Sequence, residues 1–253
     1  MRVLLEGKVS VVTGAGSGLG AAISERLAFH GSSLALMDIS EKGLEQTRET
    51  IGRKHPVPVS CFRTDVTDYD AVQRTGESII GTFGRIDVLV NCAGGGNITM
   101  KFRDHDAETW KKQIDLNLNS VFYCSKMVME QMISQKSGKI INISSVAALV
   151  GGGLLGQSAY PTAKAGVAGM TKALARELGP FGIHVNTIAP GLHVTPLTGA
   201  YGEDFINSMK EKLLLKTSGD PEKLGELVAF LASDNSQFMT GSMIVVDGGL
   251  AMH

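Results

Sequence analysis

The chain has 253 residues, 43% of them apolar, and a formal net charge of −1 from 24 basic and 25 acidic side chains. This length and composition fit one large α/β domain with a sizeable core and exclude a disordered chain. The balanced charge gives no basis for nucleic-acid binding, and no apolar run approaches the ~20 residues of a membrane-spanning helix. Because Cys61, Cys92 and Cys124 lack disulfide or metal-ligand spacing, we expect no metal site and a cytoplasmic location.

Short apolar runs alternate with segments of helical periodicity along the whole chain. Most runs are apolar throughout, which is typical of parallel strands covered on both faces. The strict alternation predicts an α/β fold with a doubly wound, Rossmann-type parallel sheet in a single domain, residues 1–253. The expected strands are 9–13, 34–38, 57–62, 86–91, 139–144, 184–189 and 243–247, and the expected helices are 18–30, 40–53, 68–83, 107–134, 158–178 and 221–233.

A glycine-rich turn follows the first expected strand and opens the first expected helix, with the sequence TGAGSGLG at residues 13–20. Gly14 permits a tight turn, Gly18 lets the backbone approach a pyrophosphate, and Gly20 lets helix and strand pack closely. The helix N-terminus then offers free N–H groups to phosphates. The spacing differs from that of phosphate-transfer loops, so the turn predicts a dinucleotide site and argues against kinase or ATPase chemistry.

Asp38 ends the second expected strand, eighteen residues after Gly20. A carboxylate there can accept hydrogen bonds from both ribose hydroxyls of the adenosine and would repel a 2′-phosphate. No Arg or Lys stands at 15–18 or 39–41 to offset that repulsion. We therefore expect NAD(H) rather than NADP(H).

Two further segments lie where strands end, which is where open α/β sheets bind ligands. Asp65 and Val66 follow the third strand, and Asn91, Ala93 and Gly94 follow or end the fourth. Asp65 is expected to hydrogen-bond the adenine amino group, and Gly94 to let the backbone pass close to the adenosine.

Tyr160 and Lys164 are four residues apart at the start of an expected helix, so their side chains share one face. A phenol has a reference pKa of about 10, and a nearby ammonium lowers it. Ser145 lies at the end of the fifth expected strand, one loop upstream. The three residues together predict acid–base chemistry on an alcohol or ketone.

With these motifs on one chain, the sequence resembles the short-chain dehydrogenase/reductase family over nearly its whole length. The resemblance includes the glycine-rich turn, Asp38, DV at 65–66, NCAG at 91–94, Asn117 in DLNLNSVF, ISS at 143–145, YPTAK at 160–164, PG at 190–191 and VDGG at 246–249. It implies seven strands in the order 3-2-1-4-5-6-7 with helices on both faces, and a homotetramer.

The resemblance also implies roles for individual residues. It makes Tyr160 the general acid/base, Ser145 a hydrogen-bond donor to the substrate oxygen, Lys164 the residue that holds the nicotinamide ribose, and Asn117 a helix-kinking residue that anchors a water in a proton relay. The cofactor-binding residues expected in all are Gly14, Ser17, Gly18, Leu19, Gly20, Asp38, Ile39, Asp65, Val66, Asn91, Ala93, Gly94, Tyr160, Lys164, Pro190, Gly191, His193 and Thr195. His193, where Ile or Val is usual, is expected to act through its main chain.

Substrate choice is expected to depend on two segments around the catalytic residues. The interval between Ser145 and Tyr160 is about two residues longer than usual, and the segment 192–216 is expected to form a mobile lid. Its apolar residues point to an apolar, uncharged substrate or, equally, to packing on the protein body. The pocket candidates are Gly95, Gly96, Val146, Leu154 and Leu155.

Three functions remain open at this point. The first is an NAD(H)-dependent oxidoreductase for a secondary alcohol or ketone, with an NADP(H)-preferring carbonyl or 3-oxoacyl-thioester reductase as its alternative. The second is a nucleotide-sensing protein without catalysis, against which the intact Ser145, Tyr160 and Lys164 argue. The third is a sugar-nucleotide epimerase or dehydratase, which usually has a larger C-terminal substrate domain than this chain can hold.

Overall fold

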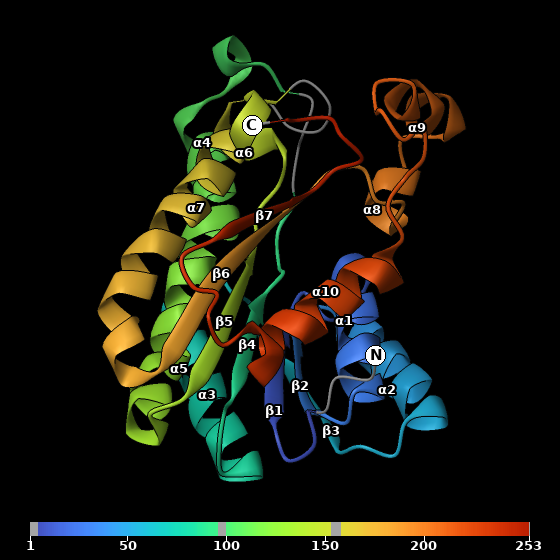
Figure 1. The fold of residues 1–253 in the computed structure, drawn as a ribbon. Coiled ribbons are helices and arrows are strands. Elements are labelled where there is room, and N and C mark those ends of the chain that lie inside the picture. The colour runs from blue at the N-terminus through green and yellow to red at the C-terminus, as the bar shows by residue number, and fades with distance from the viewer. Residues whose placement is uncertain (1–4, 96–99, 153–157, 253) are drawn as a thin grey trace.

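The computed structural model describes residues 5–95, 100–152 and 158–252. Its sheet has seven parallel strands in the order β3-β2-β1-β4-β5-β6-β7, which confirms the predicted topology (Figure 1). The strands are β1 (Val9–Thr13), β2 (Ser33–Asp38), β3 (Val59–Arg63), β4 (Val88–Asn91), β5 (Gly138–Ile143), β6 (Ile183–Pro190) and β7 (Met243–Val246).

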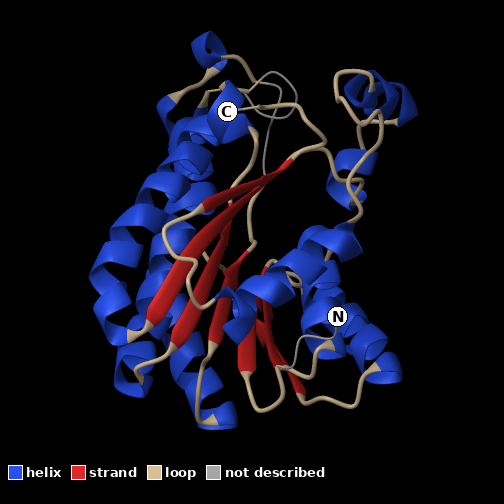
Figure 2. Ribbon diagram, in the orientation of Figure 1, coloured by secondary structure: helices blue, strands red, loops and turns tan. Residues whose placement is uncertain are grey.

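Helices cover both faces of the sheet (Figure 2). The helices α1 (Gly18–Phe29), α2 (Glu41–Lys54) and α10 (Pro221–Ala232) pack on one face, and α3 (Tyr69–Phe83), α5 (Ser120–Gln135) and α7 (Ala159–Leu178) pack on the other. Each face has its own buried apolar cluster, and β1 and β4 are buried along their whole lengths. This double burial explains why these runs are apolar throughout.

The third strand begins two residues later than expected, at Val59 rather than position 57. Pro56 and Pro58 lack an N–H group, so neither can donate to a strand ladder. The register with β2 accordingly starts after the second proline, where Leu34 is opposite Val59.

The segment expected to be one helix over 107–134 is divided. It consists of α4 (Ala107–Ile114), a π-helical turn η2 (Asp115–Asn119) and α5. Asn117 lies in the π-helical turn, and its amide nitrogen donates to the Gln113 carbonyl oxygen over 3.0 Å. The same side chain also bonds the backbone of Gly95, so a contact with another segment accompanies the interruption.

Three short helices lie at the carboxyl end of the sheet, and none of them was expected as a separate helix. They are α6 (Ala147–Val150), α8 (Pro196–Gly199) and α9 (Glu203–Lys210). In Figure 1, α8 and α9 stand apart from the helices that cover the sheet. Ile206, Met209 and Leu213 form a small apolar cluster with Leu192, whereas Leu214 and Leu215 are exposed. Parts of the segment 192–216 therefore pack against one another and against Leu250.

Candidate active site

The glycine-rich turn is held so tightly that two of its glycines have no room for a side chain. A Cβ at Gly20 would lie 2.0 Å from the Gly14 carbonyl oxygen, and one at Gly14 would lie 2.9 Å from the Ala93 Cα. Gly14 and Gly18 also have positive φ angles of 69° and 54°. Ser17 precedes α1 and makes no side-chain capping hydrogen bond, which leaves the N–H groups of the first turn available to an anion.

Asp38 lies beside this turn, where β2 ends. Its Oδ2 accepts a hydrogen bond from the Gly16 N–H over 2.9 Å, and its Oδ1 accepts one from the Ser40 N–H over 2.8 Å. These bonds fix the carboxylate at the wall of a cavity. The exposed Arg63 donates from its Nε to the neighbouring Ile39 carbonyl oxygen over 3.4 Å, so one cation lies at the same edge.

The end of β4 is held by Thr13. The Thr13 hydroxyl accepts hydrogen bonds from the N–H groups of Cys92 and Ala93, both over 3.0 Å. Asn91 is buried, and its amide donates to Asn142 over 2.9 Å. Asn91 therefore lies within the sheet and does not line the cavity, in contrast to its expected place among the cofactor-binding residues.

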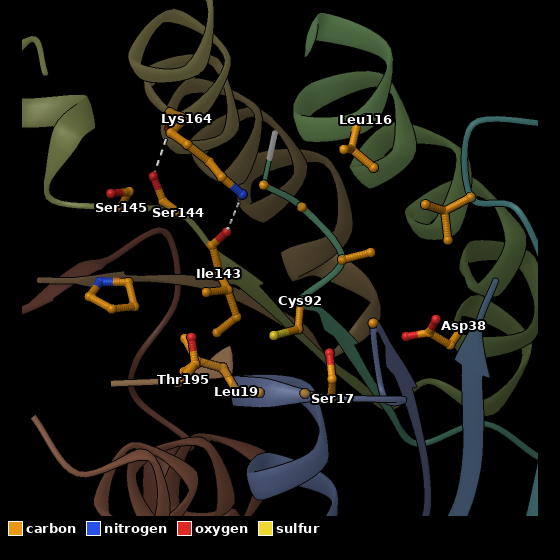
Figure 3. Close-up of a pocket in the computed structure, with 18 of the residues that line it drawn as sticks. Ser17, Leu19, Asp38, Cys92, Leu116, Ile143, Ser144, Ser145, Lys164 and Thr195 are labelled. Carbon is orange, nitrogen blue, oxygen red and sulfur yellow. Dashed lines mark hydrogen bonds between the residues drawn. The ribbon is translucent and has the colours of Figure 1, made fainter. Parts of the chain in front are cut away.

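Tyr160 and Lys164 enter the cavity from the first turns of α7. The Lys164 Nζ donates to the Ile143 carbonyl oxygen over 3.0 Å, and the Ser144 hydroxyl donates to the Lys164 carbonyl oxygen over 2.7 Å (Figure 3). The ammonium lies 5.7 Å from the centre of the Tyr160 ring. Ser145 follows β5, and its hydroxyl accepts from the Ala147 N–H over 3.1 Å. The polar contacts thus fix α7 against the end of β5.

Burial dominates the protonation of this pair. It lowers the pKa of Lys164 to about 8. It also raises the pKa of Tyr160, although a hydrogen bond with the Ser145 hydroxyl acts in the opposite direction. In the protein alone, burial is the largest influence on the pKa of Tyr160, and the net shift is opposite in direction to the lowering expected from Lys164. The phenol is protonated at neutral pH.

Asn117 lies directly behind Lys164. Its Oδ1 accepts from the Gly95 N–H and its Nδ2 donates to the Gly95 carbonyl oxygen, both over 2.9 Å. A Cβ at Gly94 would lie 2.9 Å from this Oδ1 and 3.0 Å from the Lys164 Nζ, so only glycine fits between them. Asn117 does not line the cavity and acts on its wall through Gly95.

The segment after β6 closes another side of the cavity. His193 is buried, its Nδ1 lies 3.3 Å from the Gly191 carbonyl oxygen, and burial lowers its pKa. His193 also forms a parallel bridge with Gly219. Thr195 caps α8, where its side chain accepts from the Thr198 N–H. The loop therefore has a fixed shape at His193 and Thr195.

These elements enclose one cavity of about 420 Å³. In Figure 3, Asp38 and Ser145 lie at opposite ends of the view, with Ser17 and Leu19 between them. The predicted residues that line the cavity are Gly14, Ser17, Gly18, Leu19, Gly20, Asp38, Ile39, Asp65, Val66, Ala93, Gly94, Gly95, Ser145, Tyr160, Lys164, Pro190, Gly191, His193 and Thr195. Six further residues line the cavity and were not predicted as site residues: Thr64, Cys92, Leu116, Ile143, Ser144 and Thr198.

The remaining pocket candidates divide into two groups. Val146 lines a second, smaller cavity that adjoins Ser145. Gly96, Leu154 and Leu155 lie outside the described residues.

The cavity fits a dinucleotide. It joins uncapped helical N–H groups, which suit a pyrophosphate, to a carboxylate that suits ribose hydroxyls. Within the described ranges, no group of three or more His, Cys, Asp or Glu side chains is arranged to hold a metal ion. None of the helices in those ranges has the length and apolar character that crossing a bilayer requires.

Comparisons with known proteins agree with this geometry. Residues 14–251 match a family model described as enoyl-(acyl carrier protein) reductase. A 3-oxoacyl-[acyl-carrier-protein] reductase of Thermotoga maritima is 39% identical over 98% of this chain and 99% of the relative. The corresponding enzyme of Escherichia coli is 38% identical over 98% of each chain.

Solved structures give the same result. A short-chain type dehydrogenase/reductase from Mycobacterium marinum superposes with a TM-score of 0.94 at 31% identity, over 99% of this chain and 98% of the other. The chain belongs to the short-chain dehydrogenase/reductase family. As a member of this family, it is an oxidoreductase that uses a nicotinamide cofactor and acts on CH–OH or C=O groups.

Proposed function

We propose that the protein reduces the 3-oxo group of acyl thioesters, with Tyr160 as the proton donor. The observation that carries this proposal is the convergence of Tyr160, Lys164 and Ser145 on one cavity with the glycine-rich turn and Asp38. The named relatives, which are 3-oxoacyl-[acyl-carrier-protein] reductases, support the thioester alternative over a simple secondary alcohol.

The proposed chemistry uses three side chains of this chain. A reduced nicotinamide, when bound, supplies the hydride. Tyr160 gives its phenolic proton to the carbonyl oxygen, and Ser145 donates a hydrogen bond that stabilises the negative charge developing there. Lys164, held by the Ile143 carbonyl, would hold the nicotinamide ribose of the bound cofactor. Asn117 holds the Gly95 backbone at the cavity wall, where we propose that it anchors the proton-relay water.

The proposed cofactor is NAD(H), because the Asp38 carboxylate is fixed at the cavity wall and would repel a 2′-phosphate. NADP(H) is the second candidate. NADP(H) belongs to the alternative function, a 3-oxoacyl-thioester reductase, which the named relatives favour. Arg63 also supplies one positive charge near Asp38, because its side chain is hydrogen-bonded to the Ile39 carbonyl oxygen. Direct comparison of the two cofactors distinguishes these possibilities.

We also propose a homotetramer located in the cytoplasm. The resemblance to the short-chain dehydrogenase/reductase family supports this assembly. Light scattering on the purified protein measures the assembly directly, and a monomer at micromolar concentration would refute it.

The deciding experiment follows oxidation of NADH and NADPH, side by side, with a 3-oxoacyl thioester, its 2-enoyl counterpart and a simple ketone. We expect turnover of the 3-oxoacyl thioester, loss of more than about 10³-fold in Tyr160→Phe, and unchanged NADH binding in that variant. Turnover of the enoyl thioester alone would favour the reaction named in the family description. Cofactor binding without turnover of any carbonyl compound would instead indicate a nucleotide-sensing protein.

A further inference from the structure

A second, much smaller cavity adjoins the main one at Ser145, Pro190 and Gly191. Its volume is about 20 Å³. A single water needs about 10–15 Å³ on the same measure, so this cavity holds one group the size of a water or a methyl.

Its walls are almost entirely apolar. Ala147 and Val150 come from α6, Leu192 follows β6, and Met209 comes from α9. Among the described residues that line it, Ser145 contributes the one polar side chain, and that hydroxyl already accepts a hydrogen bond from the Ala147 N–H. A charged or strongly polar group would therefore be desolvated there without a partner, whereas an alkyl group would not.

The small cavity lies next to the expected position of the reacting carbonyl group. Ser145 lines both cavities, so a carbonyl oxygen bonded to the Ser145 hydroxyl stands at the junction between them. A ketone carbon has two substituents, and the larger one has room only in the main cavity. We infer that the smaller substituent enters the small cavity next to Ser145 and that Met209 limits it to a methyl group.

This inference rests on the proposed function and narrows its substrate class to methyl ketones, with 3-oxobutanoyl thioesters preferred over longer 3-oxoacyl chains. Met209 sets the limit because its position is fixed: its side chain is 2% exposed and packs in the cluster with Leu192, Ile206 and Leu213. Met209 and Leu192 both belong to the segment expected to form a lid, and Met209 is the longer of these two lining side chains. Truncation of Met209 therefore lengthens the cavity.

The experiment compares kcat/KM for 3-oxobutanoyl and 3-oxohexanoyl thioesters of N-acetylcysteamine, with the better of the two nicotinamide cofactors at saturation. We expect the wild-type enzyme to prefer the four-carbon chain by at least tenfold. Met209→Ala should raise the ratio of six-carbon to four-carbon kcat/KM by about tenfold to twentyfold, because two extra methylenes then find apolar space. Ile206→Val, on the same helix and in the same cluster but outside the cavity, is the matched control and should leave the ratio unchanged.

Val150→Ala enlarges the same cavity from α6. It should also raise the ratio of six-carbon to four-carbon kcat/KM, which keeps the test available if Met209→Ala does not fold. Val150 is half exposed, so its truncation disturbs the core little. Equal wild-type use of both chains, or a ratio that neither variant moves, overturns this inference and leaves the proposed function intact. Failure of the wild-type enzyme to reduce either thioester, although it binds NADH, overturns the proposed function and the inference with it.

Discussion

The Lys164 ammonium donates a hydrogen bond to the main-chain carbonyl oxygen of Ile143 over 3.0 Å, inside a cavity wall where Lys164 is almost fully buried. The carbonyl only partly replaces the water that the ammonium loses, so burial still lowers the pKa of Lys164 to about 8. The site therefore keeps a lysine at a position where its charge destabilises the fold.

Lys164→Met is expected to stabilise the protein at pH 7 while it impairs turnover. Lowering the lysine pKa from 10.5 to about 8 lowers the free energy of unfolding of the wild type by about 3 kcal/mol, which the variant regains. The variant also loses the hydrogen bond to Ile143, which lowers its free energy of unfolding by about 1 kcal/mol. We expect a net gain of about 2 kcal/mol in the free energy of unfolding, measured with denaturant.

The pH dependence of this gain gives a separate check. Because the folded-state pKa of Lys164 is lowered, the unfolded chain binds more protons between pH 8 and 10.5, and wild-type stability should rise with pH in that window. The advantage of Lys164→Met should accordingly be largest below pH 8 and disappear toward pH 10.5. Lys172→Met, at an exposed position of the same helix, should show no such trend. Parallel stability curves for the wild type and Lys164→Met would contradict the argument.

The raised pKa of Tyr160 predicts different pH profiles for the two directions of the reaction: a flat one for reduction and a rising one for oxidation. Burial keeps the phenol protonated, so reduction, which needs the acid, should be nearly constant from pH 6 to about 8, where Lys164 begins to lose its charge. Oxidation needs the phenolate and should accelerate by up to tenfold per pH unit over the same range. The measurement is kcat/KM against pH in both directions, with Tyr123→Phe on α5 as the control. Reduction that accelerates with pH would exclude Tyr160 as the proton donor.

The sequence predicted the bounds of an element best where every residue of that element is buried. Val9–Thr13 was expected with its observed bounds, because every residue of β1 is buried and leaves a continuous apolar run. The periodicity predicted a continuous helix over 107–134, whereas the family resemblance implied a kink at Asn117. The observed π-helical turn is accompanied by hydrogen bonds between Asn117 and Gly95, 22 residues away. Apolar spacing along a helix carries no information about such a contact.

The same distinction applies to the candidate site. Residues with a motif, such as Gly20 and Tyr160, were predicted, and the structure gathers them in one cavity. Thr198 was missed because it reaches the cavity only through the turn after β6, where its hydroxyl donates to the His193 carbonyl oxygen. Ser144 lies beside Ser145 in the ISS motif, and its hydroxyl donates to the Lys164 carbonyl oxygen. That hydrogen bond could not be read from the sequence.

Asp38 and Arg63 should control cofactor choice in opposite directions. Asp38→Asn keeps an acceptor for the Gly16 N–H but removes the charge that repels a 2′-phosphate, so the kcat/KM ratio of NADPH to NADH should rise by about tenfold or more. Arg63→Gln should lower that ratio, because it removes the cation hydrogen-bonded to Ile39. Glu41→Gln, at an exposed position of α2, is the charge-matched control. An unchanged ratio in Asp38→Asn would remove the basis for proposing NAD(H).

The contact between His193 and Gly219 should be intolerant of a single methyl group. A Cβ at Gly219 would lie 2.3 Å from the His193 Nε2, while the Gly219 N–H is already bonded to the Leu192 carbonyl oxygen over 2.8 Å. The buried imidazole has little space to retreat, so Gly219→Ala should lower the free energy of unfolding by about 1–3 kcal/mol. Because His193 lines the cavity, the same variant should weaken NADH binding about tenfold, measured by fluorescence titration.

Gly52→Ala is the matched control, because a Cβ at Gly52 in α2 meets nothing within 4 Å. Replacing a helical glycine in open space by alanine should raise the free energy of unfolding by up to about 1 kcal/mol. The double variant Gly219→Ala, His193→Val tests the cause, since the smaller side chain at 193 makes room for the new methyl and should recover part of both losses. If Gly219→Ala lowers neither the free energy of unfolding nor the affinity for NADH, as expected for Gly52→Ala, the His193 imidazole can move aside without a loss of stability. The contact between His193 and Gly219 then does not shape the cavity wall.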